Sequence, residues 1–116
     1  MYEPNKMRIK PLPPIDNVTI AKITKITEGV FSDFVEEQYL SSFENPEAEC
    51  IQLEIETLDN YRIQHLFALP KNENEVSPKS ALGKFIEKYE SAPYESQEVR
   101  CIYSKVKDKT FYQLIL

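Results

Sequence analysis

The stretch Ser77–Glu90, with the sequence SPKSALGKFIEKYE, contains the clearest helix start in the chain. Its apolar residues recur at helical spacing and make one stripe; they are Ala81, Leu82, Phe85, Ile86 and Tyr89. A serine before them, Ser77 or Ser80, is a suitable N-cap. Gly83, one of only two glycines, lies inside the helix, where glycine costs about 1 kcal/mol relative to alanine. We therefore expect Gly83 to face a strand at short distance.

Strand patterns lie on both sides of this helix. In residues 50–70, CIQLEIETLDNYRIQHLFALP, apolar and polar residues alternate around a turn at Asp59-Asn60, which predicts a β-hairpin. After the helix, EVRCIYSKV (98–106) and TFYQLIL (110–116) predict a second hairpin. Upstream, the alternation in NVTIAKITKI (17–26) slips near Ala21-Lys22, which predicts a β-bulge or strong bend in a long first strand.

The charge is unevenly distributed along a chain whose net charge is −5. Residues 28–60 carry ten acids and no lysine or arginine, whereas both flanking parts are mildly basic. Within this acidic segment, the spacing of apolar residues from Asp33 to Phe43 predicts a short helix. Residues 1–15 read as an extended, proline-rich basic arm, and residues 16–116 as a single domain.

The predicted order is a long bent strand, two strands, one helix and two strands. The chain thereby resembles the small OB-fold proteins of archaea and phages, several of which have a helix start like Ser80–Phe85, SALGKF, after the third strand. The resemblance implies a mainly β fold, a five-stranded Greek-key barrel plugged by the helix, and binding of single-stranded nucleic acid. The resemblance also implies an archaeal or viral origin, and a composition with few glycines, no tryptophan and much lysine, glutamate and isoleucine suits a thermophile.

Binding of single strands needs cations for phosphates and aromatic faces for bases. The candidate cations are Lys105, Lys107, Lys109 and Arg62, and the candidate stacking residues are Tyr61, Tyr103 and Tyr112. The arm adds Lys6, Arg8 and Lys10. The plainer interpretation is that lysines at a hairpin tip are solvated and keep edge strands from pairing.

The acidic segment opposes this hypothesis, because it forms the connection between the first two strands and repels phosphate. Three alternatives remain open: the segment folds away from the groove, it imitates nucleic acid and covers the groove, or the ligand is a basic protein that docks on residues 28–60. The last alternative makes the chain a protein-interaction or regulatory domain, such as an inhibitor of viral or plasmid origin. The apolar final strand, YQLIL, also allows pairing into a homodimer.

Catalysis has little support in the sequence. His65 is the only histidine and shares a strand phase with Ile63 and Phe67, which favours a packed structural role. Nucleophile elbows, phosphate loops and metal-ligand clusters are absent from the sequence, so we expect no enzyme activity, no cofactor and no metal. Cys50 and Cys101 are expected to be free, buried thiols. Without a transmembrane stretch or signal peptide, we expect a cytoplasmic location and no membrane partner.

Overall fold

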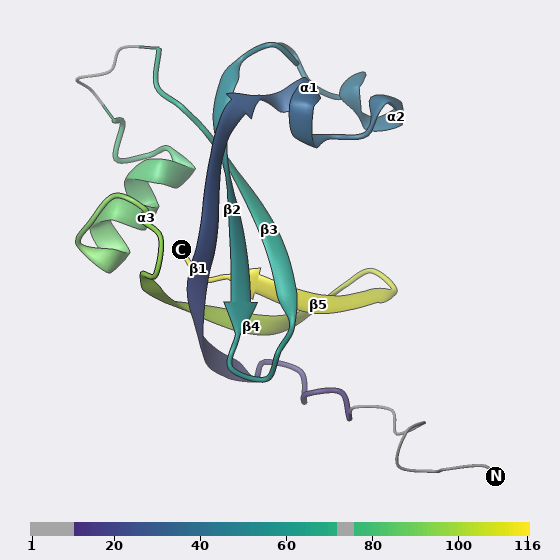
Figure 1. Ribbon diagram of the computed structural model, residues 1–116. Helices are drawn as coiled ribbons and strands as arrows, with labels where there is room; N and C mark the ends of the chain where they lie inside the picture. The colour runs from purple at the N-terminus through teal and green to yellow at the C-terminus, as the bar shows by residue number, and fades with distance from the viewer. Residues whose placement is uncertain (1–10, 72–75) are drawn as a thin grey trace, which may run out of the picture.

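A computed structural model of the chain describes residues 11–71 and 76–116 and places one five-stranded antiparallel sheet at its centre (Figure 1). The strands are β1 (Val18–Val30), β2 (Glu49–Thr57), β3 (Arg62–Ala68), β4 (Glu98–Val106) and β5 (Lys109–Leu114). They lie in the order β3-β2-β1-β4-β5. The helices are α1 (Phe31–Phe34), α2 (Glu37–Leu40) and α3 (Ala81–Tyr89). The mainly β class and the place of the main helix between β3 and β4 are confirmed.

The long strand β1 holds the two hairpins together. Its first part, Val18–Lys22, pairs with β4, and its longer second part, Ala21–Val30, pairs with β2. The register shifts between Ile23 and Lys25, and the hydroxyl of Thr24 at that point donates to the Glu54 carbonyl across 3.1 Å. The expected bulge is therefore present, but it lies slightly later in the strand than the sequence alternation indicated.

The two edge strands, β3 and β5, approach each other on one side of the sheet. No ladder joins β3 to β5 within the described ranges, so the sheet is not closed as the expected barrel. Side chains nevertheless meet across the gap, because the ring centroids of Tyr61 and Tyr112 are 5.4 Å apart. Tyr61 and Tyr112 thus close one end of the gap, and the edges of β3 and β5 face each other along the rest of it.

The core is made of the inward-facing residues of all five strands and one face of α3. Its largest fully buried side chains are Phe67, Phe85, Ile23, Leu53, Ile55 and Val99, with the thiols Cys50 and Cys101. Both cysteines are free and buried, as expected. The rings of Phe67 and Phe85 meet edge to face at 5.6 Å, which fixes α3 against β3.

Gly83 is buried, but its close neighbour is not the strand that the sequence led us to expect. A Cβ built at this position would contact the Ser77 carbonyl oxygen and would lie 2.9 Å from Pro78 Cα. The loop that leads into α3 folds back over the first turn of the helix. Ser80 supports this arrangement, since its hydroxyl donates to the Ser77 carbonyl at 2.7 Å and accepts from the Gly83 amide at 3.0 Å.

The acidic connection between β1 and β2 contains two single helical turns in place of the one short helix expected from Asp33 to Phe43. Asp33 lies within the first turn, and its carboxylate accepts from the Val30 amide at 3.0 Å. The rings of Phe31 and Phe43 pack at 5.1 Å and join the two ends of the segment. These contacts make residues 31–48 one folded segment, the acidic unit, at one end of the sheet (Figure 1).

The cations Lys6, Arg8 and Lys10 of the expected arm lie outside the described residues. Of that arm, the structure describes only residues 11–15, which lead into β1 without regular secondary structure. None of the helices within the described ranges is long and apolar enough to cross a membrane.

Candidate functional site

The facing edges of β3 and β5 form a groove with a volume of about 490 Å³. Its lining residues are Ile63, Gln64 and His65 from β3, and Phe111, Tyr112, Gln113 and Leu114 from β5. Phe111 is 39% exposed, whereas Tyr112 and Leu114 are buried and belong to the core. The groove therefore combines an apolar floor, an exposed aromatic ring and amide side chains.

Tyr103 and Tyr112, two of the expected stacking residues, are buried. Each is 3% exposed, and their ring centroids lie 5.1 Å apart in an edge-to-face contact. The Tyr112 hydroxyl donates to the Asp59 carboxylate at 2.8 Å and accepts from the Asn17 amide at 2.9 Å. Burial, followed by the bond to Asp59, raises the pKa of the Tyr112 phenol. These two rings stabilise the core and present no free face to a base.

Phe111 is the aromatic side chain on the surface of this region, and it was not among the expected stacking residues. The alternation in β5 contained the signal: Tyr112 and Leu114 share the inward phase, so Phe111 and Gln113 point outward. Tyr61 is half-buried at the end of the gap, where its ring packs on Tyr112. Among the described aromatic residues beside the gap, Phe111 and Tyr61 are therefore the ones with surface open to a ligand.

The expected cations are all exposed, and in the sequence they are close to the residues that line the groove. Lys105, Lys107 and Lys109 surround the β4–β5 turn, and β5 leads from Lys109 directly into the groove wall at Phe111. The Arg62 side chain is 87% exposed and lies 3.9 Å from the Glu56 carboxylate, a surface ion pair of small energy. Arg62 immediately precedes Ile63, the first groove residue of β3.

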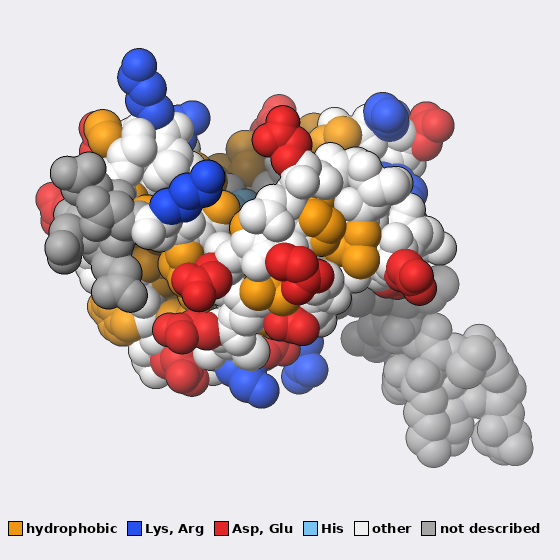
Figure 2. Space-filling view, turned by 90° about the horizontal axis from the view of Figure 1, so that it is seen from above, with side chains coloured by type: hydrophobic (Ala, Val, Ile, Leu, Met, Phe, Trp, Pro, Cys, Tyr) orange, Lys and Arg blue, Asp and Glu red, His pale blue; other side chains and the backbone are white. Residues whose placement is uncertain are grey.

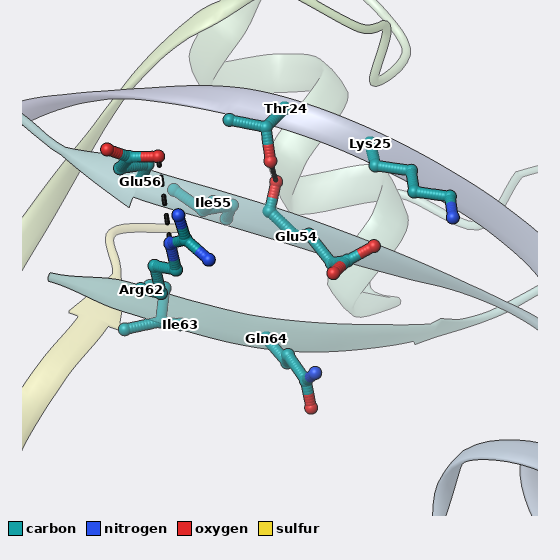
Figure 3. Close-up of a pocket in the computed structure, with 8 residues that line it drawn as sticks. All are labelled: Thr24, Lys25, Glu54, Ile55, Glu56, Arg62, Ile63 and Gln64. Atoms are coloured by element: carbon teal, nitrogen blue, oxygen red, sulfur yellow. Dashed lines mark hydrogen bonds and ion pairs between the residues drawn. The ribbon is translucent and has the colours of Figure 1, made fainter.

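A second and larger hollow, of about 800 Å³, lies on the outer face of β1, β2 and β3 (Figure 3). Its charges alternate across the strands, since Lys25 pairs with Glu54 and Arg62 pairs with Glu56 in the register. Figure 3 shows Arg62 turned toward Glu56 and Gln64 pointing away from β2. This face is charge-balanced and offers no continuous positive surface.

The acidic unit and the β4–β5 hairpin, called the basic hairpin because it carries Lys105, Lys107 and Lys109, lie at opposite ends of the sheet. In Figure 1, α1 and α2 project to the right at the top, and the β4–β5 turn projects to the same side lower down. Figure 2, seen from above, shows acidic side chains over much of the near face, with basic side chains at its edges and also within its left part. The region between the acidic unit and the basic hairpin therefore has acidic side chains on one side and basic side chains on the other.

The titratable groups near the groove are few. The His65 ring packs on Phe67 with centroids 4.5 Å apart, and burial lowers the pKa of the imidazole, so it is neutral at pH 7. Burial raises the pKa of Cys101 to about 12, which makes this thiol a poor nucleophile. In the part of the chain that the structure describes, no cluster of histidine, cysteine, aspartate or glutamate has the makings of a metal site.

Comparison of the chain with models of protein families, with curated proteins and with solved structures finds no significant match. Function is therefore inferred from the geometry of the two hollows, the hairpin and the acidic unit.

Proposed function

We propose that the chain is an OB-type barrel, open between β3 and β5, that binds single-stranded nucleic acid without catalysing a reaction. The strand order supports the fold assignment, because β1 serves both hairpins through a bulge and α3 covers one end between β3 and β4. OB-folds bind oligonucleotides on the face of their second and third strands and through the loop between the fourth and fifth. The basic β4–β5 hairpin corresponds to that loop, and the groove adjoins the third strand at its edge with β5.

The observation that carries the proposal is the continuity of the basic hairpin with the groove along β5. Lys109, Phe111 and Gln113 share the exposed face of this strand, with about 7 Å between successive members. A phosphate at Lys109 then has an aromatic ring and a polar groove beside it for the attached base. A cation beside an aromatic ring is the combination by which single-strand binding proteins hold the backbone and stack the bases.

In this proposal Lys105, Lys107, Lys109 and Arg62 contact the backbone of the strand, and Phe111 with Tyr61 contacts bases. Phe111 takes the role that the sequence had suggested for Tyr103 and Tyr112, since both of those rings are buried. The acidic unit lies at the other end of the sheet and limits the track by repelling phosphates there. Of the three alternatives for the acidic segment, the proposal adopts the one in which it folds away from the groove.

A second candidate function is docking of a basic protein on the acidic unit. The observation that favours it is that this unit is folded without a partner, since the Phe31–Phe43 contact and the Asp33 carboxylate hold its conformation. Tyr39 is 58% exposed there and supplies the kind of aromatic side chain that is enriched at interfaces. A lysine-rich peptide that bound the chain while oligonucleotides did not would favour this second function.

The test is anisotropy of labelled single-stranded DNA and RNA at a series of salt concentrations. Each lost phosphate contact lowers the slope of log affinity against log salt by about 0.7. Replacing Lys105, Lys107 and Lys109 by alanine should therefore reduce the slope by about 2. The matched control replaces Lys79, Lys84 and Lys88, three exposed lysines at and beside α3, and should change the slope little. Absence of binding by the unaltered chain even at low salt would refute the proposal.

A further inference from the structure

We infer that the groove between β3 and β5 is a pocket for one unstacked nucleobase, and that Gln64 and Gln113 read adenine in it. The inference rests on the proposed function and adds base recognition to a surface that otherwise contacts only the backbone. It concerns the residues that line the groove, none of which is needed for attraction of phosphate.

The charge of the groove decides what enters it. No lysine, arginine, aspartate or glutamate is among the described residues that line it, and its one imidazole is neutral at pH 7. A phosphate would find no electrostatic attraction in such a lining, whereas the lysines of the nearby hairpin attract it. The larger hollow is different, because acidic and basic side chains alternate in its wall, so it offers a base no neutral lining. A neutral part of the ligand, which is the base, therefore suits the smaller groove.

The shape of the groove also suits a flat ring. Ile63 and the small exposed parts of Tyr112 and Leu114 form an apolar lining, and the exposed ring of Phe111 supplies a face on which a base stacks. The volume of about 490 Å³ lies within the range of small-ligand pockets. Its walls come from two strands that no ladder joins, so a ring can enter without breaking a backbone bond of the sheet.

The polar groups of the groove are amides on opposite walls. Gln64 is exposed and points away from β2 in Figure 3, and Gln113 is exposed on β5. Each amide offers two donor hydrogens and one acceptor oxygen, and glutamine pairs through two hydrogen bonds with the N6 and N7 positions of adenine. The neutral ring of His65 also lines the groove and carries one donor and one acceptor nitrogen. This set favours adenine over the other three bases.

The experiment uses oligonucleotides of abasic residues that carry one central adenine, cytosine, guanine or thymine, with the full chain and a fully abasic control. We expect the adenine oligonucleotide to bind about fivefold or more tightly than the others. Gln64→Ala and Gln113→Ala should each remove this preference and leave the salt slope unchanged, because neither residue contacts phosphate. Gln52→Ala, on β2 and outside the groove, is the matched control and should retain the preference.

The outcomes separate the two levels of the proposal. If every oligonucleotide, including the abasic one, binds with equal affinity and a normal salt slope, or if another base is preferred, the pocket assignment is wrong and the proposed function stands. If none binds at low salt, both are wrong. Circular dichroism melts of the glutamine variants show whether each variant keeps its fold, so a loss of preference is assigned to the groove only in a folded protein.

Discussion

Replacing Gly83 by alanine should destabilise the domain, although the same change in most helices has the opposite effect. Alanine is favoured over glycine by about 1 kcal/mol in a helix. Here the added methyl group would meet the Ser77 carbonyl and the Pro78 Cα, both of which belong to the backbone of the preceding loop. A backbone neighbour cannot turn aside as the end of a flexible side chain can, so the loop itself has to move.

The magnitude follows from the contacts that this movement disturbs. Forcing a methyl group into a packed site costs about 1–3 kcal/mol. Movement of the loop also strains the bonds of Ser80 to Ser77 and Gly83, and loss of an N-cap costs about 1 kcal/mol. Subtracting the gain in helix propensity leaves a net destabilisation of about 2 kcal/mol.

The assay is urea unfolding followed by circular dichroism. For a slope near 2 kcal/mol per molar urea, the expected change is a fall of about 1 M in the midpoint. Lys84→Ala, at the adjacent exposed position, is the control and should stay within about 0.5 kcal/mol of the unaltered chain. A Gly83→Ala variant as stable as the unaltered protein, or more stable, would show that the loop does not lie over the helix as described.

Two further predictions concern titratable groups. Cys50 and Cys101 should react with a thiol reagent only on unfolding, because both are buried and both pKa values are raised; reaction of either thiol in the native protein would contradict the packing. Since burial lowers the pKa of His65 below 6.5, the unfolded chain takes up this proton first, and stability should fall as the pH drops from 6.5 to the folded pKa. Urea unfolding at a series of pH values measures this effect. The free energy of unfolding of the unaltered chain should fall relative to that of His65→Gln as the pH drops through this range. A difference that stays constant with pH would show that His65 is not buried.

Local patterns predicted most of the secondary structure. The alternation around Asp59-Asn60 and the stripe in Ala81–Tyr89 led to β3 and α3 with nearly the observed bounds, because each element there has one buried face. The single helix expected from Asp33 to Phe43 was wrong in form. Apolar spacing alone did not reveal that Asp33 bonds back to Val30 at the start of the first turn, or that Val35 is extended and ends this turn.

Features that depend on distant residues were harder to predict. Sequence spacing cannot show whether β3 and β5 form a ladder, since their pairing depends on the bend of β1 between them. Burial of Tyr103 and Tyr112 follows from the phase they share with Cys101 and Leu114, yet tyrosine is common on surfaces, so composition pointed the other way. The neighbour of Gly83 is a loop that no periodic pattern places.

The position of β1 at the centre of the sheet has a consequence for synthesis of the chain. β1, β2 and β3 can pair as soon as Ala68 has emerged, but the first part of β1 has no partner until β4, which begins at Glu98, is made. Until then the nascent protein presents an open strand edge that includes Ala21, a core residue. Closing it requires a contact between distant parts of the chain, which is the slow step in folding of such topologies. Unfinished chains are therefore the form most exposed to pairing with one another.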